Sequence, residues 1–328
     1  MKVRGSIGIR SLLGNVVFGT VVTAIPVVVL AAQIPTTSAR YDINLSGTFD
    51  PVNDTNIVNT NSAPSTTTSN SDGTSSCIVN ACSGATGSST ASADFGTLRA
   101  GSTGAVAGAV TGPTGASVGG SYSVDAQVQY IDDITVLSDN LANGTVVQAT
   151  VYLALNGSVG VDAFGGNSHP TDGVANLDAI LSFAGGSLHL CTLDDPFGVT
   201  PTTTGCVEGA GASFLETSMI ADFVIGQQYA IEGTLTSNVF GRTADQFIEQ
   251  TGTGETSSSS AFANATHTSN TYLQPLGDFF FSSGSGHDYS LPDTNGIPEP
   301  GTLALLSVGV MGASLSRRRR GIAGVALG

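Results

Sequence analysis

The sequence predicts an all-β fold, specifically an antiparallel β-sandwich of jelly-roll type. From Tyr122 to Tyr130 every second residue is apolar, and this period of two is typical of a strand with one buried face. Turn residues separate similar runs at regular intervals along the chain. The stretches between these runs lack the spacing of amphipathic helices, so a parallel α/β fold is disfavoured.

The strands are expected in chain order, with glycine-containing turns between them. Asn143-Gly144 predicts a hairpin turn, and Gly185-Gly186 predicts a second turn. Asp132-Asp133 is expected to break a strand, and Asn156-Gly157 to end one. The expected strands and their resumptions are Asp94–Leu98, Ser121–Tyr130, Ile134–Leu137, Val147–Leu155, Ala179–Phe183, Leu188–Leu193, Met219–Ile225, Tyr229–Leu235 and Ala261–Thr268.

Residues 1–39 are expected to form a secretory signal peptide. Three basic residues lie within the first ten positions, and Ser11 to Ala32 follow without a charge. The small residues Thr37-Ser38-Ala39 favour cleavage after Ala39. Because the apolar stretch is longer than usual, an uncleaved signal anchor is the alternative.

Residues 40–93 are expected to be a low-complexity segment. The part from Ser46 to Thr90 is rich in Ser, Thr, Asn and Gly and holds few large apolar side chains. Such a composition buries too little surface to offset the entropy lost on ordering, so a flexible spacer or long loop is expected. A β-sandwich ectodomain is then expected over 94–290, followed by a linker over 291–296.

The charge distribution excludes one class of partner. All 25 acidic residues lie between Asp42 and Glu299, and Arg99 and Arg242 are the only basic side chains between positions 41 and 298. Two arginines against 24 acids leave that segment with a formal charge of −22. A surface of this charge repels nucleic acid and anionic membranes, whereas it attracts divalent cations.

Four cysteines fall into two local groups, Cys77 with Cys82 and Cys191 with Cys206. In an exported protein two local disulfides are the expected arrangement, although four cysteines allow three connectivities. A zinc site is disfavoured because the cysteine spacings are wrong and the histidines are scattered.

Several patterns resemble catalytic motifs, and each has a simpler interpretation. Residues 115–119 match G-x-S-x-G but lie in a Gly-rich tract without the strand and helix of a nucleophile elbow. His287-Asp288 follows Ser283 and Ser285, and a polar loop is the favoured interpretation. Paired carboxylates are expected to mark turns. We therefore expect no enzyme activity and no catalytic residues.

Calcium is the one metal that the sequence supports as a candidate. Its weak candidate ligands offer oxygen atoms in a very acidic chain, but they match no complete calcium-binding loop. They are Asp132, Asp133, Asp194 and Asp195. A carbohydrate-binding surface would instead need an exposed aromatic side chain, for which Tyr122, Tyr130 and Tyr152 are the candidates.

Three signals follow one another near the end of the chain. Pro298-Glu299-Pro300 is extended and poor in N–H donors, and Thr302 to Ser316 carries no charge. As a helix these 15 residues would span about 22 Å, which is shorter than the roughly 30 Å hydrocarbon core. Four arginines, Arg317, Arg318, Arg319 and Arg320, would then remain on the cytoplasmic side.

This tail resembles the PEP-CTERM sorting signal of exported proteins of Gram-negative bacteria. The resemblance covers residues 297–320 and leaves a tail at 321–328. It implies a single short transmembrane sorting helix, transient retention in the inner membrane, and processing by an exosortase near Pro-Glu-Pro. Residues 94–289 are also similar, more loosely, to the extracellular domain of many such proteins, through Ala93–Leu98, Tyr130–Asp133 and Ser283–Tyr289.

The expected function is that of a structural or adhesive protein of the cell surface or of an exopolysaccharide matrix, as in a biofilm. A carbohydrate-binding module and a secreted hydrolase of the matrix are the alternatives. Extracellular polysaccharide or matrix is the expected partner besides the exosortase, and nucleic acid is not.

Overall fold

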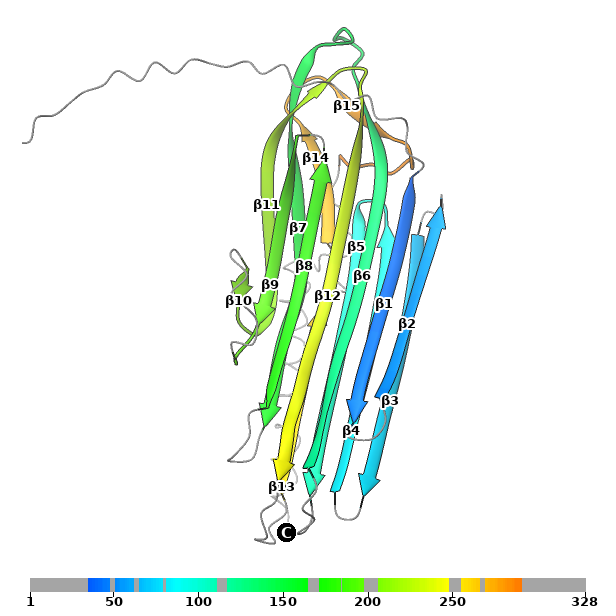
Figure 1. Ribbon diagram of the computed structural model, residues 1–328. Coiled ribbons are helices and arrows are strands. Elements are labelled where there is room, and N and C mark those ends of the chain that lie inside the picture. The colour runs from blue at the N-terminus through cyan, green and yellow to red at the C-terminus, as the bar shows by residue number, and fades with distance from the viewer. Residues whose placement is uncertain are drawn as a thin grey trace, which may run out of the picture.

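Two β-sheets lie face to face, with their strands running along a common long axis (Figure 1). The expectation of an all-β, two-sheet fold is confirmed. The computed structural model describes residues 35–47, 51–61, 65–78, 81–110, 117–164, 171–183, 185–197, 206–247, 255–265 and 269–290. Residues 1–34 of the expected signal peptide and the expected sorting helix lie outside these residues. Within them, no helix is long and apolar enough to cross a membrane.

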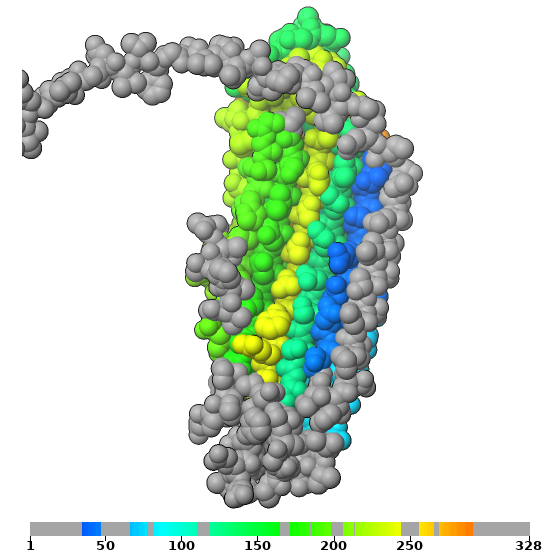
Figure 2. Space-filling view, in the orientation of Figure 1, coloured from blue at the N-terminus to red at the C-terminus, as the bar shows by residue number. Residues whose placement is uncertain are grey.

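Sheet A contains the first two strands of the chain and most of its middle. Its order is β10 (Val207–Glu208), β9 (Gly186–Asp194), β8 (Asp172–Phe183), β12 (Gln228–Phe247), β6 (Ser117–Leu137), β1 (Thr36–Gly47) and β2 (Pro51–Asn61), with β15 (Phe280–Ser283) also paired to β6. Figure 2 shows β8, β12, β6 and β1 side by side as close rows of atoms on the outer face of this sheet.

Sheet B covers the other face of the core. Its order is β11 (Gly211–Val224), β7 (Val146–Phe164), β13 (Glu255–Asn264), β5 (Thr97–Val110), β4 (Ala81–Asp94) and β3 (Ser65–Ile78), with β14 (Ser269–Pro275) paired to β5 and β7. Among the described strands all pairs are antiparallel except β10 with β9. Consecutive strands change sheet repeatedly, at β2–β3, β5–β6, β6–β7, β7–β8, β10–β11, β11–β12, β12–β13 and β14–β15.

In the core, large side chains of sheet A pack against small residues of sheet B. A Cβ atom placed on Gly104 of β5 would lie 2.1 Å from the ring of Tyr122, and one on Gly87 of β4 would lie 2.7 Å from Val124. These two glycines therefore leave the space that Tyr122 and Val124 fill, and both larger side chains are fully buried. Burial of each such side chain contributes about 1.5–3 kcal/mol, and close packing explains why small residues face them.

Within the low-complexity segment 40–93, the expectation of a flexible spacer or long loop from Ser46 to Thr90 is wrong for the described residues. Strands β1, β2, β3 and β4 lie there, and β4 pairs along its length with both β3 and β5. Its hydroxyl residues alternate with small ones, so inward side chains such as Ala85 and Ala91 pack against sheet A while polar ones face out. Inward hydroxyls pair with each other, as Thr37 and Thr66 do at 2.8 Å.

The first strand includes the residue at which signal cleavage was expected. Ala39 lies within β1, is 1% exposed, and pairs with Val128 of β6. Cleavage after Ala39 would remove the first four residues of β1, including the buried Thr37. The fold therefore favours a mature chain that begins before Thr36.

Several strands are longer than the sequence predicts. β6 continues through Asp132-Asp133 to Leu137, so this pair does not break the strand. β7 continues through Asn156-Gly157, because the missing side chain of Gly157 leaves room for Leu177, which would lie 2.4 Å from a Cβ there. Both expectations failed because burial, rather than local turn propensity, decides where these strands end.

The predicted turns differ in outcome. Gly185, at φ +103°, links β8 and β9 as a hairpin, as expected. Gly144, at φ +90°, also lies in a turn, but the turn connects β6 in sheet A with β7 in sheet B and is not a hairpin. The Gly144 N–H donates to the Ile225 carbonyl at 2.9 Å, which ties this turn to the β11–β12 connection.

Both expected disulfides, Cys77–Cys82 and Cys191–Cys206, are confirmed.

Candidate functional site

The residues of the predicted sorting signal lie outside the described part of the chain, but the fold positions the segment that leads to them. Ser290 is the last described residue, and the loop before it is held against β6. The anchor is Asp132, whose side chain is fully buried. Hydrogen bonds to Asp132 hold the last described loop of the chain against β6.

Asp132 is surrounded by hydrogen-bond donors from this loop. The Ser285 N–H donates to Asp132 Oδ1 at 3.0 Å, and the Tyr289 O–H donates to Oδ2 at 3.1 Å. The Ser285 O–H also donates to Oδ2, and the Asp133 N–H to Oδ1 at 2.8 Å. A buried carboxylate needs such partners, so Asp132 has a clear structural role.

Its neighbour Asp133 points to the other side of the strand and has a similar role. Gln228 of β12 donates to Asp133 Oδ2 at 3.0 Å, and the Gly284 N–H donates to the Asp133 carbonyl at 2.7 Å.

Burial raises the pKa of Tyr289 well above its usual value, and the nearby Tyr130 and Asp132 add to this shift. Tyr289 therefore remains a neutral donor to Asp132.

The serine, histidine and aspartate near position 287 do not form a triad. Ser283 Oγ donates to the His287 carbonyl at 2.8 Å, and the His287 ring packs edge-on against Tyr289 with ring centres 4.5 Å apart. Asp288 instead accepts bonds from the N–H and O–H of Ser290, which lower its pKa. These groups close a loop, in agreement with the favoured interpretation.

The other calcium candidates lie elsewhere in the fold. Asp194 ends β9, is buried, and its Oδ2 accepts the Val161 N–H at 2.8 Å. Asp195 follows it outside the strand. Among the described residues no three His, Cys, Asp or Glu side chains come together as metal ligands. The structure therefore does not bring the two predicted aspartate pairs into one site.

The fold places the three tyrosines suggested for sugar contact in different environments, two in the core and one at the surface. Tyr122 and Tyr130 are buried in the core. Tyr152 lies partly exposed on the outer face of sheet B and stacks on Tyr272, with ring centres 4.3 Å apart. The Tyr152 O–H donates to Gln274 Oε1 and the Tyr272 O–H donates to Glu216 Oε2, both at 3.0 Å. Only Tyr152 of the three is therefore available at the surface.

The sequence did not indicate a shallow depression on the outer face of sheet A. Asp42 of β1 and Asp125 of β6 are directly opposite each other there, in a hollow of about 230 Å³. Burial raises the pKa of Asp125, opposed by a hydrogen bond from Asn238, and Asp42 raises it further. Arg40 lies 3.6 Å from Asp42, so the charges of this hollow are partly balanced within the protein.

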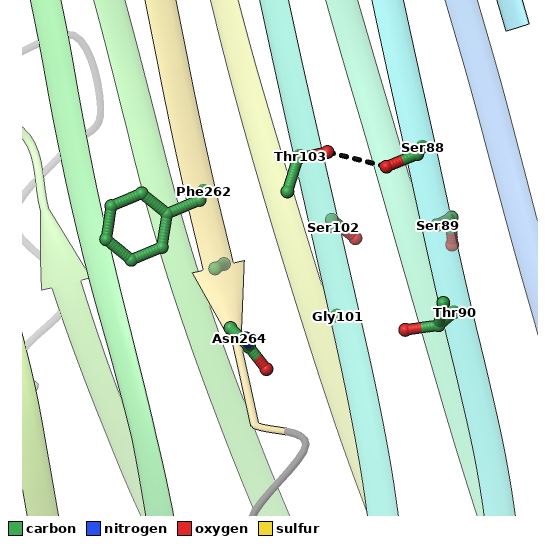
Figure 3. A pocket seen from close by; sticks show the side chains of 9 residues that line it. Ser88, Ser89, Thr90, Gly101, Ser102, Thr103, Phe262 and Asn264 are labelled. Atoms are coloured by element: carbon green, nitrogen blue, oxygen red, sulfur yellow. Dashed lines mark hydrogen bonds between the residues drawn. The ribbon is translucent and has the colours of Figure 1, made fainter. Parts of the chain in front are cut away.

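A second depression, of about 290 Å³, crosses β4, β5 and β13 on the outer face of sheet B (Figure 3). Its polar groups are hydroxyls and an amide, and Phe262 forms one side. These residues come from three separate parts of the chain and carry no spacing motif. Strand pairing brings them together, and no pattern in the sequence predicted this groove.

Comparison with known proteins addresses the tail directly. Residues 296–320 match the model of the PEP-CTERM protein-sorting motif. The chain carries a PEP-CTERM sorting motif. No curated protein and no solved structure matches the chain. The resemblance seen in the sequence is confirmed for the motif, and the motif supports an exported protein processed by an exosortase.

The PEP-CTERM motif begins close to the folded domain. Only residues 291–295 separate Ser290 from the first matched residue. The eight residue-to-residue steps from Ser290 to Pro298 span at most about 28 Å when the chain is fully extended. Pro298 therefore lies within about 28 Å of Ser290.

Proposed function

We propose that this protein is a non-enzymatic structural or adhesive component of the cell surface or exopolysaccharide matrix. The PEP-CTERM motif directs its export, holds it briefly in the inner membrane, and is removed by an exosortase. The folded domain then functions outside the cell. The observation that carries the proposal is the match of residues 296–320 to the motif.

The chemistry of the sorting segment supports processing rather than permanent anchoring. The uncharged stretch is short for a membrane helix, and Arg317 to Arg320 resist transfer across the bilayer. Such a segment is held in the membrane under strain while Pro298-Glu299-Pro300 stays outside it, extended and accessible. An enzyme embedded in the same membrane can therefore bind the cleavage segment in its extended conformation.

The folded domain supports an extracellular role. Its two disulfides are stable in an oxidising environment, and a formal charge of −22 between positions 41 and 298 keeps the chains soluble and apart. Its described outer surface is rich in hydroxyl groups, as on β4 and β13. Hydroxyls offer hydrogen bonds without charge, which suits contact with hydrated polysaccharide.

The test is a substitution in the sorting segment, made in the native host. Glu299→Ala is expected to leave full-length precursor in the membrane fraction and to deplete the protein from the extracellular fraction. Glu208→Ala, at an exposed position of β10, is the matched control and should be processed normally. The measurement is the amount and size of the protein in each fraction. Normal release of the Glu299→Ala chain contradicts the proposal.

A further inference from the structure

We propose that the groove across β4, β5 and β13 binds an oligosaccharide that carries a carboxylate group. This inference rests on the proposed function, because it names the class of matrix ligand that the domain would contact. The groove and the strand that forms its floor have three features that suit such a ligand. They are a floor without a side chain, the aromatic side chain of Phe262 at one edge, and Arg99, which lies beyond the groove lining on the same face of β5.

The floor of the groove is Gly101 of β5. Strand pairing sets Thr90 of β4 on one side of it and Asn264 of β13 on the other. Because Gly101 has no side chain, a notch is left between the Thr90 hydroxyl and the Asn264 amide. Such groups donate and accept hydrogen bonds, as the hydroxyls of a sugar require.

The next row along the strands is Ser88, Thr103 and Phe262. Ser88 and Thr103 are bonded to each other at 2.6 Å, which fixes both hydroxyls at the groove (Figure 3). A hydroxyl in such a pair keeps an unused lone pair or proton for a ligand. The notch and this row together make a polar strip several residues long.

Phe262 supplies the aromatic platform. A Cβ atom on Gly160 of β7 would lie 2.5 Å from the Phe262 ring, so the ring lies over this glycine, on the side of β13 away from Thr103 and Gly101 (Figure 3). Figure 3 shows the ring face-on in a view onto the sheet, and the side chain is 42% exposed. One face of the ring is therefore open to solvent. An open aromatic face suits the apolar C–H face of a sugar ring.

Arg99 supplies the charge. It precedes Gly101 by two residues on the same outward face of β5, a distance of about 7 Å along the strand. The other described arginines are paired, Arg242 with Asp172 and Arg40 with Asp42. Among the described residues no carboxylate forms an ion pair with Arg99.

An unneutralised arginine is unusual in so acidic a domain. Arginine presents donors that match the two oxygens of a carboxylate, and this favours an acidic sugar over a neutral one. The surrounding negative charge of the protein opposes binding of a polyanion in general. A site with Arg99 at one end therefore selects a sugar whose carboxylate reaches this one position.

The experiment measures binding of two probes to the mature protein by titration calorimetry at low ionic strength. One probe is a hexamer of galacturonic acid and the other is a neutral glucose hexamer. The acidic hexamer is expected to bind at least ten-fold more tightly. Arg99→Gln should remove most of this preference, whereas Arg40→Gln, on the other sheet, should keep it.

A second variant tests the platform. Phe262→Ala should weaken binding of both hexamers about ten-fold or more, and an unchanged thermal unfolding curve shows that the fold persists. Equal affinity for the two probes, no binding at millimolar concentration, or an Arg99→Gln variant that binds normally overturns the inference. The release of mature protein from the host is measured separately, so failure here is distinguishable from failure of the sorting proposal.

Discussion

Asp132 shows how one residue can connect the fold to the sorting signal. A buried carboxylate loses its hydration, and this loss is offset only when donors surround it. The Ser285 and Tyr289 donors come from the last loop of the domain, so the same bonds that satisfy Asp132 also fix this loop. The chain therefore leaves the domain from a defined place.

Removing this carboxylate should be costly. We expect Asp132→Ala to lower the free energy of unfolding by about 3 kcal/mol, because it leaves several buried donors without an acceptor. The measurement is urea denaturation, together with hydrogen exchange of the amides of Ser285 and Gly284, which bond to Asp132 and to the Asp133 carbonyl and should exchange faster. Asp139→Ala, at an exposed loop position, should stay within about 0.5 kcal/mol of the parent protein. Similar losses in both variants would show that Asp132 does not anchor the loop.

The role of Asp132 could not be read from the sequence. An Asp-Asp pair is common in turns, and local propensity therefore indicated a break in the strand. The loop donors to Asp132 lie far away in the sequence, 153 positions for Ser285 and 157 for Tyr289. Arg99 was visible from the start as a rare basic residue, but strand pairing is needed to place Thr90 and Asn264 on either side of the nearby Gly101.

At the scale of elements, strands β2, β3 and β4 are the main difference between expectation and structure. Their residues are too small and polar to indicate a core when considered alone. The structure packs β4 against large side chains of sheet A, so that Gly87 faces Val124, Ile43 and Leu45. A low-complexity composition therefore does not exclude order when its partner strand supplies the volume.

The beginning of β1 gives a prediction at this scale. A mature chain that starts at Arg40 should be less stable than one that starts at Pro35, on the order of 2 kcal/mol. The shorter chain lacks several hydrogen bonds to β6 and the buried pair of Thr37 and Thr66. The check is the urea midpoint of the two chains. Thr37→Ala in the longer chain isolates the hydroxyl pair and should cost about half as much.

Equal midpoints for the two chains would mean that the start of β1 contributes nothing to stability. Signal cleavage after Ala39 would then be compatible with the fold. A clear difference instead supports a cleavage site before Thr36, which is upstream of the position that the small residues Thr37-Ser38-Ala39 indicate.

At the scale of the whole molecule, the sequence predicted the class of fold and both disulfides. The period-two pattern is a property of neighbouring residues, and cysteine pairing over short loops needs little tertiary information. The order of strands within the two sheets could not be predicted in the same way. The turn at Gly144 was located correctly from its residues, but only the packing shows that it changes sheet.

The same contrast applies to function. The sorting motif is contiguous, so Pro298-Glu299-Pro300 and the following arginines were sufficient to recognise it. The groove is assembled from three strands and was invisible in the sequence. Together these features describe a rigid, acidic sandwich attached to a removable tail.

The central claim is that this tail is removed before the protein functions. The most direct measurement is the intact mass of the protein recovered from the extracellular fraction of its own host. We predict a mass that lacks Arg317 to Arg320 and everything after the cleavage near Pro298-Glu299-Pro300, with both disulfides formed. A recovered protein that still carries those four arginines would contradict the account.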